Sequence, residues 1–356
     1  MGFDRKLKYD LQSCPSALGF RVPAEWEPHE ATWLAWPHDF ETWPEELPQI
    51  EAIYCEIIEH LCSGEKVHVL VEDEQMKDSV FQKLRAKGIT KNVFLHQIET
   101  DSIWIRDYGP MFLVRRLGKS AFLNFKFNAW GRKYDAFEKD DQVPNRLTSI
   151  LDAQEFRAEL VLEGGAIDVN GMGTCLTTEE CVLNPNRNTS LTRQEMEQCL
   201  RDFVGVRQVI WLEAGLAGDD TDGHIDEVAR FVAPTTVVAA LEWNTHSQDF
   251  GSLKKNWEQL CKSVDQDGKR FNIITLPMPE TVALNGIQLP ASYANFYIGN
   301  KVVLVPVFNR RSDRTALGIL KDLFPSRNVV GINSIPLIIG LGAIHCITQQ
   351  QPAPLV

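Results

Sequence analysis

The spacing of apolar residues changes in an order that repeats along the chain. It is first every second residue, as in a strand, then every three or four residues, as in a helix, and then every second residue again. Its clearest copy has two extended segments within 165–178, an amphipathic helix over 192–204 with apolar residues three or four positions apart, and a strand over 206–212. A capping box that begins at Thr192 predicts the start of this helix, and Gly205 predicts its end. The pattern therefore describes a module of strand, tight turn, strand, helix and strand.

Four more segments show the same order, more loosely in the first half of the chain: 31–72, 111–163, 228–277 and 293–332. A further helix and strand over 78–97 extend the first of them. Five modules of one kind, without a linker, predict a single domain of the α+β class over residues 1–356, with the modules arranged around an axis. The polar residues at the module ends should then meet at the centre.

Composition and charge narrow the classes of function. Of the 356 residues, 44% are hydrophobic and 24% are charged, which is typical of a soluble globular protein with a large core. The net charge of −12 argues against nucleic acid or an anionic membrane as a partner and favours a small cationic ligand. A charged N-terminal segment, and no apolar run that approaches ~18 residues, predict neither a secretion signal nor a membrane span, so we expect a cytoplasmic protein.

Residues that could carry chemistry gather in four short segments at the module ends: 104–107, 162–165, 218–227 and 345–346. The stretch from Glu213 to Glu227 holds six carboxylates and His224 but no lysine or arginine. A solvated acidic loop is one interpretation of such a charge run. Apolar residues on both sides favour a second interpretation, in which the carboxylates face a pocket and require a cation.

A metal ion is one candidate for this cation, with four ligands: Glu163, His224, Asp226 and Cys346. Hard divalent ions prefer oxygen shells, and zinc sites more often use closely spaced pairs such as HExxH or CxxC, neither of which occurs in the sequence. We therefore expect no metal and no cofactor. A planar guanidinium fits better, because two carboxylates can bind its fork of donors in a bidentate way, and Asp107 and Asp226 are the natural pair.

The carbon of a bound guanidinium is electrophilic, so its reaction needs a nucleophile that works near neutrality. Cys346 can serve, because the positive charge of the substrate lowers a thiol pKa from its usual value of about 8.5. His224 would carry protons, and Glu163 would orient it. A buried and inert thiol is the alternative interpretation of Cys346. We interpret the neighbouring His345 as structural, since adjacent side chains on a strand point to opposite faces.

Six longer segments carry a family resemblance: WIRDYGP (104–110), FNAWGRKY (127–134), LEGGAIDVNGMGTCLTTEECVLNPNRN (162–188), GDDTDGHIDEVARFVAP (218–234), PASYANFYIGNKVVLVP (290–306) and IHCITQQQP (344–352). Together they resemble the agmatine deiminases and the related bacterial peptidylarginine deiminases, over nearly the whole chain. The resemblance implies the pentein fold, a pseudo-fivefold αβ propeller, which agrees with the five modules.

The resemblance also implies a hydrolase that acts on a guanidino carbon–nitrogen bond. Cys346 matches the nucleophile that forms an amidino-cysteine intermediate, His224 matches the general acid and base, and Glu163 matches a carboxylate of the site. The implied role of Asp107 and Asp226 is to bind the guanidinium, in agreement with the pairing argued from their chemistry.

Two further residues are expected at the substrate. Trp104 opens the first matching segment, and Asp220 stands where agmatine deiminases usually have a glutamate that contacts substrate. Asp220 is one methylene shorter, and a turn cap is its alternative role. The family also shows glycine and asparagine where this chain has Leu341 and Ala343, so we expect the turn before Cys346 to differ in shape, because lost glycines restrict positive φ.

The function implied by the resemblance is hydrolysis of agmatine to N-carbamoylputrescine and ammonia, a step toward putrescine and the other polyamines. A peptidylarginine or free arginine deiminase is the alternative; free arginine would need a cation for its carboxylate, for which Arg132 or Arg310 could serve. An amidinotransferase and a non-catalytic binder of guanidino compounds rank lower. We expect a homodimer.

Overall fold

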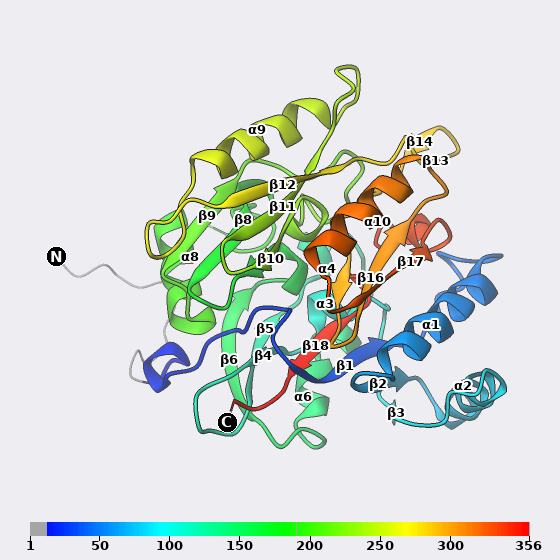
Figure 1. The fold of residues 1–356 in the computed structure, drawn as a ribbon. Helices are drawn as coiled ribbons and strands as arrows, with labels where there is room; N and C mark the ends of the chain where they lie inside the picture. The colour runs from blue at the N-terminus through cyan, green and yellow to red at the C-terminus, as the bar shows by residue number, and fades with distance from the viewer. Residues whose placement is uncertain (1–12, 190, 356) are drawn as a thin grey trace.

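The computed structural model describes residues 13–189 and 191–355, and in this part of the chain five small sheets follow one pairing rule (Figure 1). In each sheet an antiparallel pair of strands is followed by a parallel pair. Parallel neighbours need a crossover connection, which helices supply. The five sheets correspond to the five modules expected from the sequence, while their arrangement around one axis stays a prediction.

Three modules match the predicted order closely. The first has β7 (Ile167–Val169), β8 (Thr174–Thr178), α7 (Glu179–Val182), α8 (Arg193–Cys199) and β9 (Gln208–Leu212). The next has β10 (Ala229–Ala233), β11 (Thr236–Leu241), α9 (Phe250–Lys262) and β12 (Asn272–Pro277). The last has β15 (Tyr297–Ile298), β16 (Val302–Val307), α10 (Ser312–Leu323) and β17 (Asn328–Asn333). A hairpin of β13 (Ala283–Leu284) and β14 (Ile287–Gln288) separates the last two modules.

The local signals for α8 are confirmed. The Thr192 hydroxyl accepts a hydrogen bond from the Glu195 amide (3.3 Å), and the Glu195 carboxylate accepts one from the Thr192 amide (2.8 Å), which completes the capping box. The helix continues as a π-helical turn (Leu200–Val204) and ends at Gly205, which has a φ of 81°. Glycine adopts this left-handed conformation without the penalty of a Cβ.

The module over 111–163, which precedes these three, departs from the predicted order of strands and helices. It contains β4 (Met111–Leu113), β5 (Ala121–Lys126), the short helices α4 (Ala129–Arg132), α5 (Glu138–Asp141) and α6 (Val143–Leu147), and β6 (Gln154–Val161). Within this module the sequence predicts a helix over 144–154 and a strand over 158–163. The helix instead ends at Leu147, and the strand begins four residues earlier. Alternating burial along β6 explains the difference, because it follows the strand period and not the helix period.

The first sheet is completed by the end of the chain. β1 (His29–Ala35), α1 (Leu47–Leu61), β2 (Lys66–Val71), α2 (Glu74–Ala86) and β3 (Val93–Gln97) were all expected. The sequence did not predict β18 (Gln349–Pro352), which pairs antiparallel with β1 and lies beside it in Figure 1. Because β18 begins three residues after Cys346, this pairing anchors the segment that carries the expected nucleophile.

Peripheral helices cover the sheets with apolar faces. α1 lies at the edge of the molecule in Figure 1 and buries one side of its surface: Leu47, Ile50, Ile53, Tyr54, Ile57, Ile58 and Leu61. No helix among the described residues is long and apolar enough to span a membrane. The charged residues 1–12, used above to argue against a secretion signal, lie outside the described residues.

Candidate active site

Cys346 lies in a turn that connects a short 3-10 helix, Leu337–Gly340, to β18. The turn is anchored on both sides, because the Cys346 carbonyl accepts a hydrogen bond from the Arg106 amide (3.1 Å) and the His345 amide donates to Asn295 Oδ1 (2.9 Å). The thiol is 7% exposed and its Sγ lies 3.3 Å from Asn295 Nδ2. Residues 345 and 346 are therefore not on a strand, so the reason given for separating their side chains was wrong.

The turn before Cys346 has its left-handed residue at Leu341, and the expected difference in shape from the family stays a prediction. Leu341 itself takes the left-handed conformation, with a φ of 68°, although a side chain there costs roughly 1–2 kcal/mol. Neither Gly340 nor Gly342 has a positive φ. A Cβ on Gly340 would collide with the ring of Trp43, and one on Gly342 with the ring of Trp104. These two glycines thus make room for indole rings.

Asp107 lies in the short helix α3 (Ile105–Tyr108) and is buried. Its Oδ1 accepts a hydrogen bond from the Gly165 amide (3.0 Å), and its Oδ2 accepts one from Trp130 Nε1 (2.9 Å). Burial raises the pKa of Asp107 to about 6, the charge of His224 opposes this rise, and Asp226 adds a smaller rise. The carboxylate is thus ionised at neutral pH but close to titration.

Asp226 faces the thiol, with Oδ2 3.8 Å from Cys346 Sγ, and is completely buried. Burial alone would raise the pKa of Asp226, but the hydrogen bond and the charge of His345 outweigh it and lower the pKa. The distance from His345 Nδ1 to Asp226 Oδ2 is 2.7 Å. The second oxygen, Oδ1, has no hydrogen-bond partner among the described residues, so it is free to accept a donor from a ligand.

His224 immediately precedes a 3-10 turn, Ile225–Glu227, and its ring is buried. Within the described part of the chain neither ring nitrogen has a hydrogen-bond partner, and Nδ1 lies 3.7 Å from Asp107 Oδ1. Burial lowers the pKa of His224, but the charges of Asp107, Asp226 and Glu163 outweigh it and raise the pKa above its usual value. A protonated imidazole in this position can donate to a leaving nitrogen.

Glu163 is buried beside His224, but its hydrogen bond runs elsewhere. Its Oε1 accepts from Arg187 Nε over 2.5 Å, and the same guanidinium donates to Asp222 Oδ2 and to the Thr221 carbonyl. Glu163 and Arg187 are each 1% exposed at their side chains. Arg187 therefore connects Glu163 to the acidic loop that carries His224.

A cavity opens at Cys346, and three of the four expected substrate contacts lie on its wall, while Asp226 does not. Its lining residues are Trp104, Asp107, Trp130, Tyr134, Asp220, Thr221, Gly340, Leu341, Gly342 and Cys346. Asp220 Oδ2 accepts a hydrogen bond from the Tyr134 hydroxyl (2.7 Å) and its Oδ1 lies 3.6 Å from Lys133 Nζ. The lining contains neither lysine nor arginine.

The electrostatic environment holds Cys346 in its thiol form when no cation is bound. Burial raises the pKa of the Cys346 thiol well above its usual value, and the negative charges of Asp226 and Asp107 raise it further. A guanidinium placed between the carboxylates would reverse this effect, because an opposite charge nearby favours the thiolate. Substrate binding and activation of the nucleophile are thereby coupled.

Four residues of the site escaped the sequence-based assignment: Trp130, Arg187, Asn295 and the bridging His345. All four stand inside segments that carried the family resemblance, which was the available signal. The backbone around Trp130 is left-handed from Ala129 through Arg132, with φ values between 51° and 91°. Such a run is rare for non-glycine residues, and here it presents the indole N–H to Asp107.

Cys346 and Asp107 line one cavity, Asp226 lies 3.8 Å from the thiol and His224 lies 3.7 Å from Asp107. These groups define a site suited to breaking a carbon–nitrogen bond in a planar cation. Comparison with known proteins agrees with this class. The model of the Porphyromonas-type peptidyl-arginine deiminase family matches residues 21–352, and the chain belongs to that family. A Legionella pneumophila protein named "Putative agmatine deiminase" is 37% identical over 347 residues, which cover 96% of this chain and 98% of that protein.

Solved structures agree over the whole fold. The agmatine deiminase of Enterococcus faecalis superposes with a TM-score of 0.90 at 31% identity, covering 97% of this chain and 99% of that one. A C. jejuni agmatine deiminase with substrate bound superposes with a TM-score of 0.85 at 30% identity, covering 95% and 97%. The chain thus has the pentein fold that the resemblance implied.

Proposed function

We propose that the protein hydrolyses agmatine to N-carbamoylputrescine and ammonia, with Cys346 as the nucleophile. The observation that carries the proposal is the charge of the cavity at Cys346, whose lining includes Asp107 and Asp220 but no lysine or arginine. Agmatine is positive at both ends, so a guanidinium near Asp107 and an amine near Asp220 both meet carboxylates. The names of the relatives support the same substrate.

In the proposed course, Asp107 and Asp226 bind the guanidinium and place its carbon next to Cys346 Sγ. The thiolate forms a bond to this carbon, His224 protonates the departing nitrogen, and ammonia leaves. The product of this half-reaction is a thiouronium on Cys346. A water that His224 deprotonates then attacks the same carbon and the thiolate leaves, which produces a urea. Glu163 contributes to the negative environment that keeps His224 protonated at the first step.

Free arginine fits this cavity less well, because its carboxylate would lie near Asp220. The nearest cation, Lys133, is bound to Asp222 over 2.8 Å. Arg132 and Arg310, considered above as partners for such a carboxylate, are absent from the lining. The proposal therefore predicts strong preference for the decarboxylated substrate.

The remaining expectations concern location and assembly. Six cysteines carry free thiols, Cys55, Cys62, Cys175, Cys181, Cys261 and Cys346, which supports a reducing compartment such as the cytoplasm. The homodimer stays a prediction, to be measured by light scattering on the purified protein.

The experiment that tests the function compares agmatine, arginine and an arginyl peptide as substrates for the wild type and Cys346→Ser, with detection of ammonia and of the ureido product. We expect turnover of agmatine alone by the wild type and none by Cys346→Ser. Equal turnover of the arginyl peptide would overturn the substrate assignment while leaving the chemistry intact. Inactivity of the wild type toward all three, with agmatine still bound, would favour the non-catalytic binder.

A further inference from the structure

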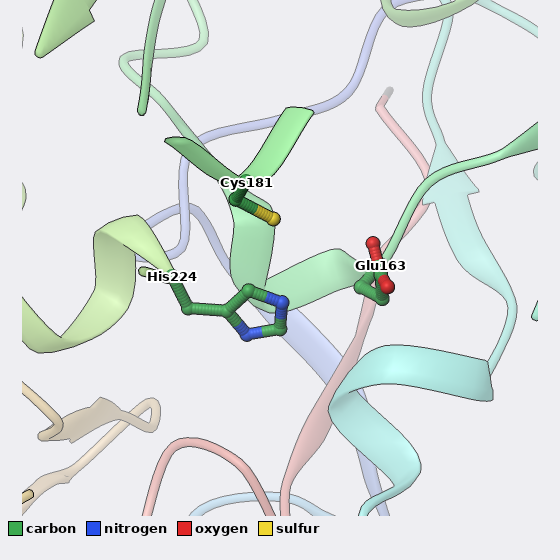
Figure 2. A group of neighbouring side chains, drawn as sticks. All are labelled: Glu163, Cys181 and His224. Atoms are coloured by element: carbon green, nitrogen blue, oxygen red, sulfur yellow. The ribbon is translucent and has the colours of Figure 1, made fainter. Parts of the chain in front are cut away.

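A second buried thiol lies next to His224, and the proposed reaction does not use it. Cys181 belongs to α7 and is completely buried. Its sulfur, a ring nitrogen of His224 and a carboxylate oxygen of Glu163 all lie within 4.8 Å of one another. Figure 2 shows the three side chains converging on one space from three separate segments of the chain.

His224 provides an independent reason to expect a ligand at this place. Its side chain is 1% exposed, yet neither ring nitrogen has a hydrogen-bond partner among the described residues. A buried polar group without a partner costs about 1–3 kcal/mol. A substrate that bonds to one ring nitrogen of His224 leaves the other without a partner. This second nitrogen can bind a ligand that lies beside Cys181.

The surrounding charge favours a cation there. Asp107 Oδ1 lies 3.7 Å from His224 Nδ1, and Glu163 belongs to the group itself. Arg187 is the opposing charge, since it binds Glu163, but its guanidinium is also paired with Asp222 over 2.5 Å. Carboxylates therefore outnumber the cation, which lowers the cost of bringing a divalent ion into this space.

We propose that Glu163, Cys181 and His224 form a binding site for Zn²⁺, and that zinc bound there inhibits the enzyme. A thiolate, an imidazole nitrogen and a carboxylate oxygen are the three kinds of ligand that zinc takes in proteins, and three protein ligands leave a fourth position for water. On binding, the Cys181 thiol and the protonated His224 each release a proton to solvent, and the sulfur and a ring nitrogen bond to the metal. The metal occupies a lone pair of His224, which can then no longer carry protons.

The site differs from the metal site weighed from the sequence, which combined four residues: Glu163, His224, Asp226 and Cys346. The structure separates them, because Asp226 and Cys346 form a second group with Glu227. That second group has no imidazole, and Asp226 Oδ2 is already bound to His345 over 2.7 Å. Zinc should therefore prefer the group of Cys181, where it would be an inhibitor and not a cofactor.

Binding is tested directly with Co²⁺, whose bond to a thiolate produces a charge-transfer absorption. The metal is titrated into Cys346→Ser and into the double variant Cys346→Ser/Cys181→Ser. The exposed Cys261 and the half-buried Cys62 are common to both proteins, so their background cancels. We expect thiolate absorption at one equivalent in the first protein, its absence from the second, and its displacement by Zn²⁺ but not by Mg²⁺, which prefers oxygen ligands.

Inhibition rests on the proposed function and is measured separately, as loss of agmatine turnover after incubation with Zn²⁺. Cys181→Ser should turn over agmatine like the wild type but need at least about tenfold more Zn²⁺ for half inhibition. Because two cations on either side of His224 repel each other, agmatine should protect the wild type. Cys181→Ala replaces Cys181→Ser in both arms if the serine variant does not fold.

Equal Co²⁺ absorption in the single and double variants would overturn the proposed site. So would thiolate absorption that appears only when Cys346 is intact, because the metal would then be bound by the nucleophile. Undiminished sensitivity of Cys181→Ser to Zn²⁺ would overturn the inhibitory role. None of the results with Co²⁺ depends on turnover, so failure of the site and failure of the proposed function are distinguishable.

Discussion

His345 is bound to Asp226 and not to its chain neighbour Cys346. Its Nδ1 lies 2.7 Å from Asp226 Oδ2, and on the other side its Nε2 lies 2.7 Å from Glu25 Oε2. Arg230 donates to the same Glu25 oxygen over 2.9 Å. The imidazole thus bridges two buried carboxylates and fixes the orientation of the one that faces the thiol.

His345→Ala should weaken both stability and substrate binding, because it removes a partner from both Asp226 and Glu25. Breaking a buried ion pair in this way typically costs about 3–5 kcal/mol, which denaturant unfolding would measure. His345→Gln keeps one hydrogen bond and should recover part of the stability while the KM for agmatine stays raised. His60→Ala, on α1 and outside the site, is the control. An unchanged KM in both His345 variants would contradict the bridging role.

Asp226 and Glu227 are adjacent buried carboxyl groups, and we expect their replacement by amides to affect activity differently. Burial raises the pKa of Glu227 well above its usual value, with Asp226 and Asp219 adding to the effect, so the uncharged form of Glu227 is favoured. Glu227→Gln should therefore retain activity within a few fold. Asp226→Asn removes a needed charge and should lower kcat/KM by about 10²-fold or more. Equal loss of activity in the two amide variants would contradict this difference in charge between Asp226 and Glu227.

The pH dependence should follow Asp107. Binding of a guanidinium requires the ionised carboxylate, and burial raises the pKa of Asp107 to about 6. kcat/KM should therefore be level above this pH and fall about tenfold per unit below it. Trp130→Phe removes a hydrogen bond to the ionised form, so it should move this limb to higher pH. A wild-type profile that stays level down to pH ~4, the usual carboxyl range, would exclude Asp107 as the titrating group.

Two substitutions in the turn before Cys346 test whether its glycines are needed for space or for backbone freedom. Gly342→Ala forces a methyl group against the Trp104 ring, and such overpacking costs about 1–3 kcal/mol. We expect it to lower both the melting temperature and agmatine turnover, since Trp104 lines the cavity. Leu341→Gly relieves a left-handed side chain but loses packing and frees the unfolded chain, so its net change should stay within about 1 kcal/mol. Tolerance of Gly342→Ala with full activity would refute this explanation.

Periodicity was sufficient for the repeating module, because each strand and helix buries a face that its apolar spacing reveals. It was insufficient for β18, where QQQP has no apolar period and pairing with β1 decides the conformation. The segment around Cys346 also lacks an apolar period, and for this reason His345 and Cys346 were wrongly expected on a strand. A turn, unlike a strand, has no period from which the direction of a side chain follows.

The candidate site was predictable in its reactive groups but not in the groups that hold them. Cys346, His224 and the acidic residues stand out by chemistry and by resemblance to a family. Arg187 and Asn295 act through contacts with residues 24 and 51 positions away in the chain, and such contacts exist only in the folded molecule.

The central claim is that Cys346 bonds to the guanidino carbon of agmatine, and mass spectrometry of enzyme quenched in acid during turnover tests it most directly. The account predicts an adduct with the mass of agmatine less ammonia on the peptide that contains Cys346. The adduct should be retained in Cys181→Ser and absent, together with turnover, from Cys346→Ser. An adduct on another residue, or undiminished turnover by Cys346→Ser, would contradict it.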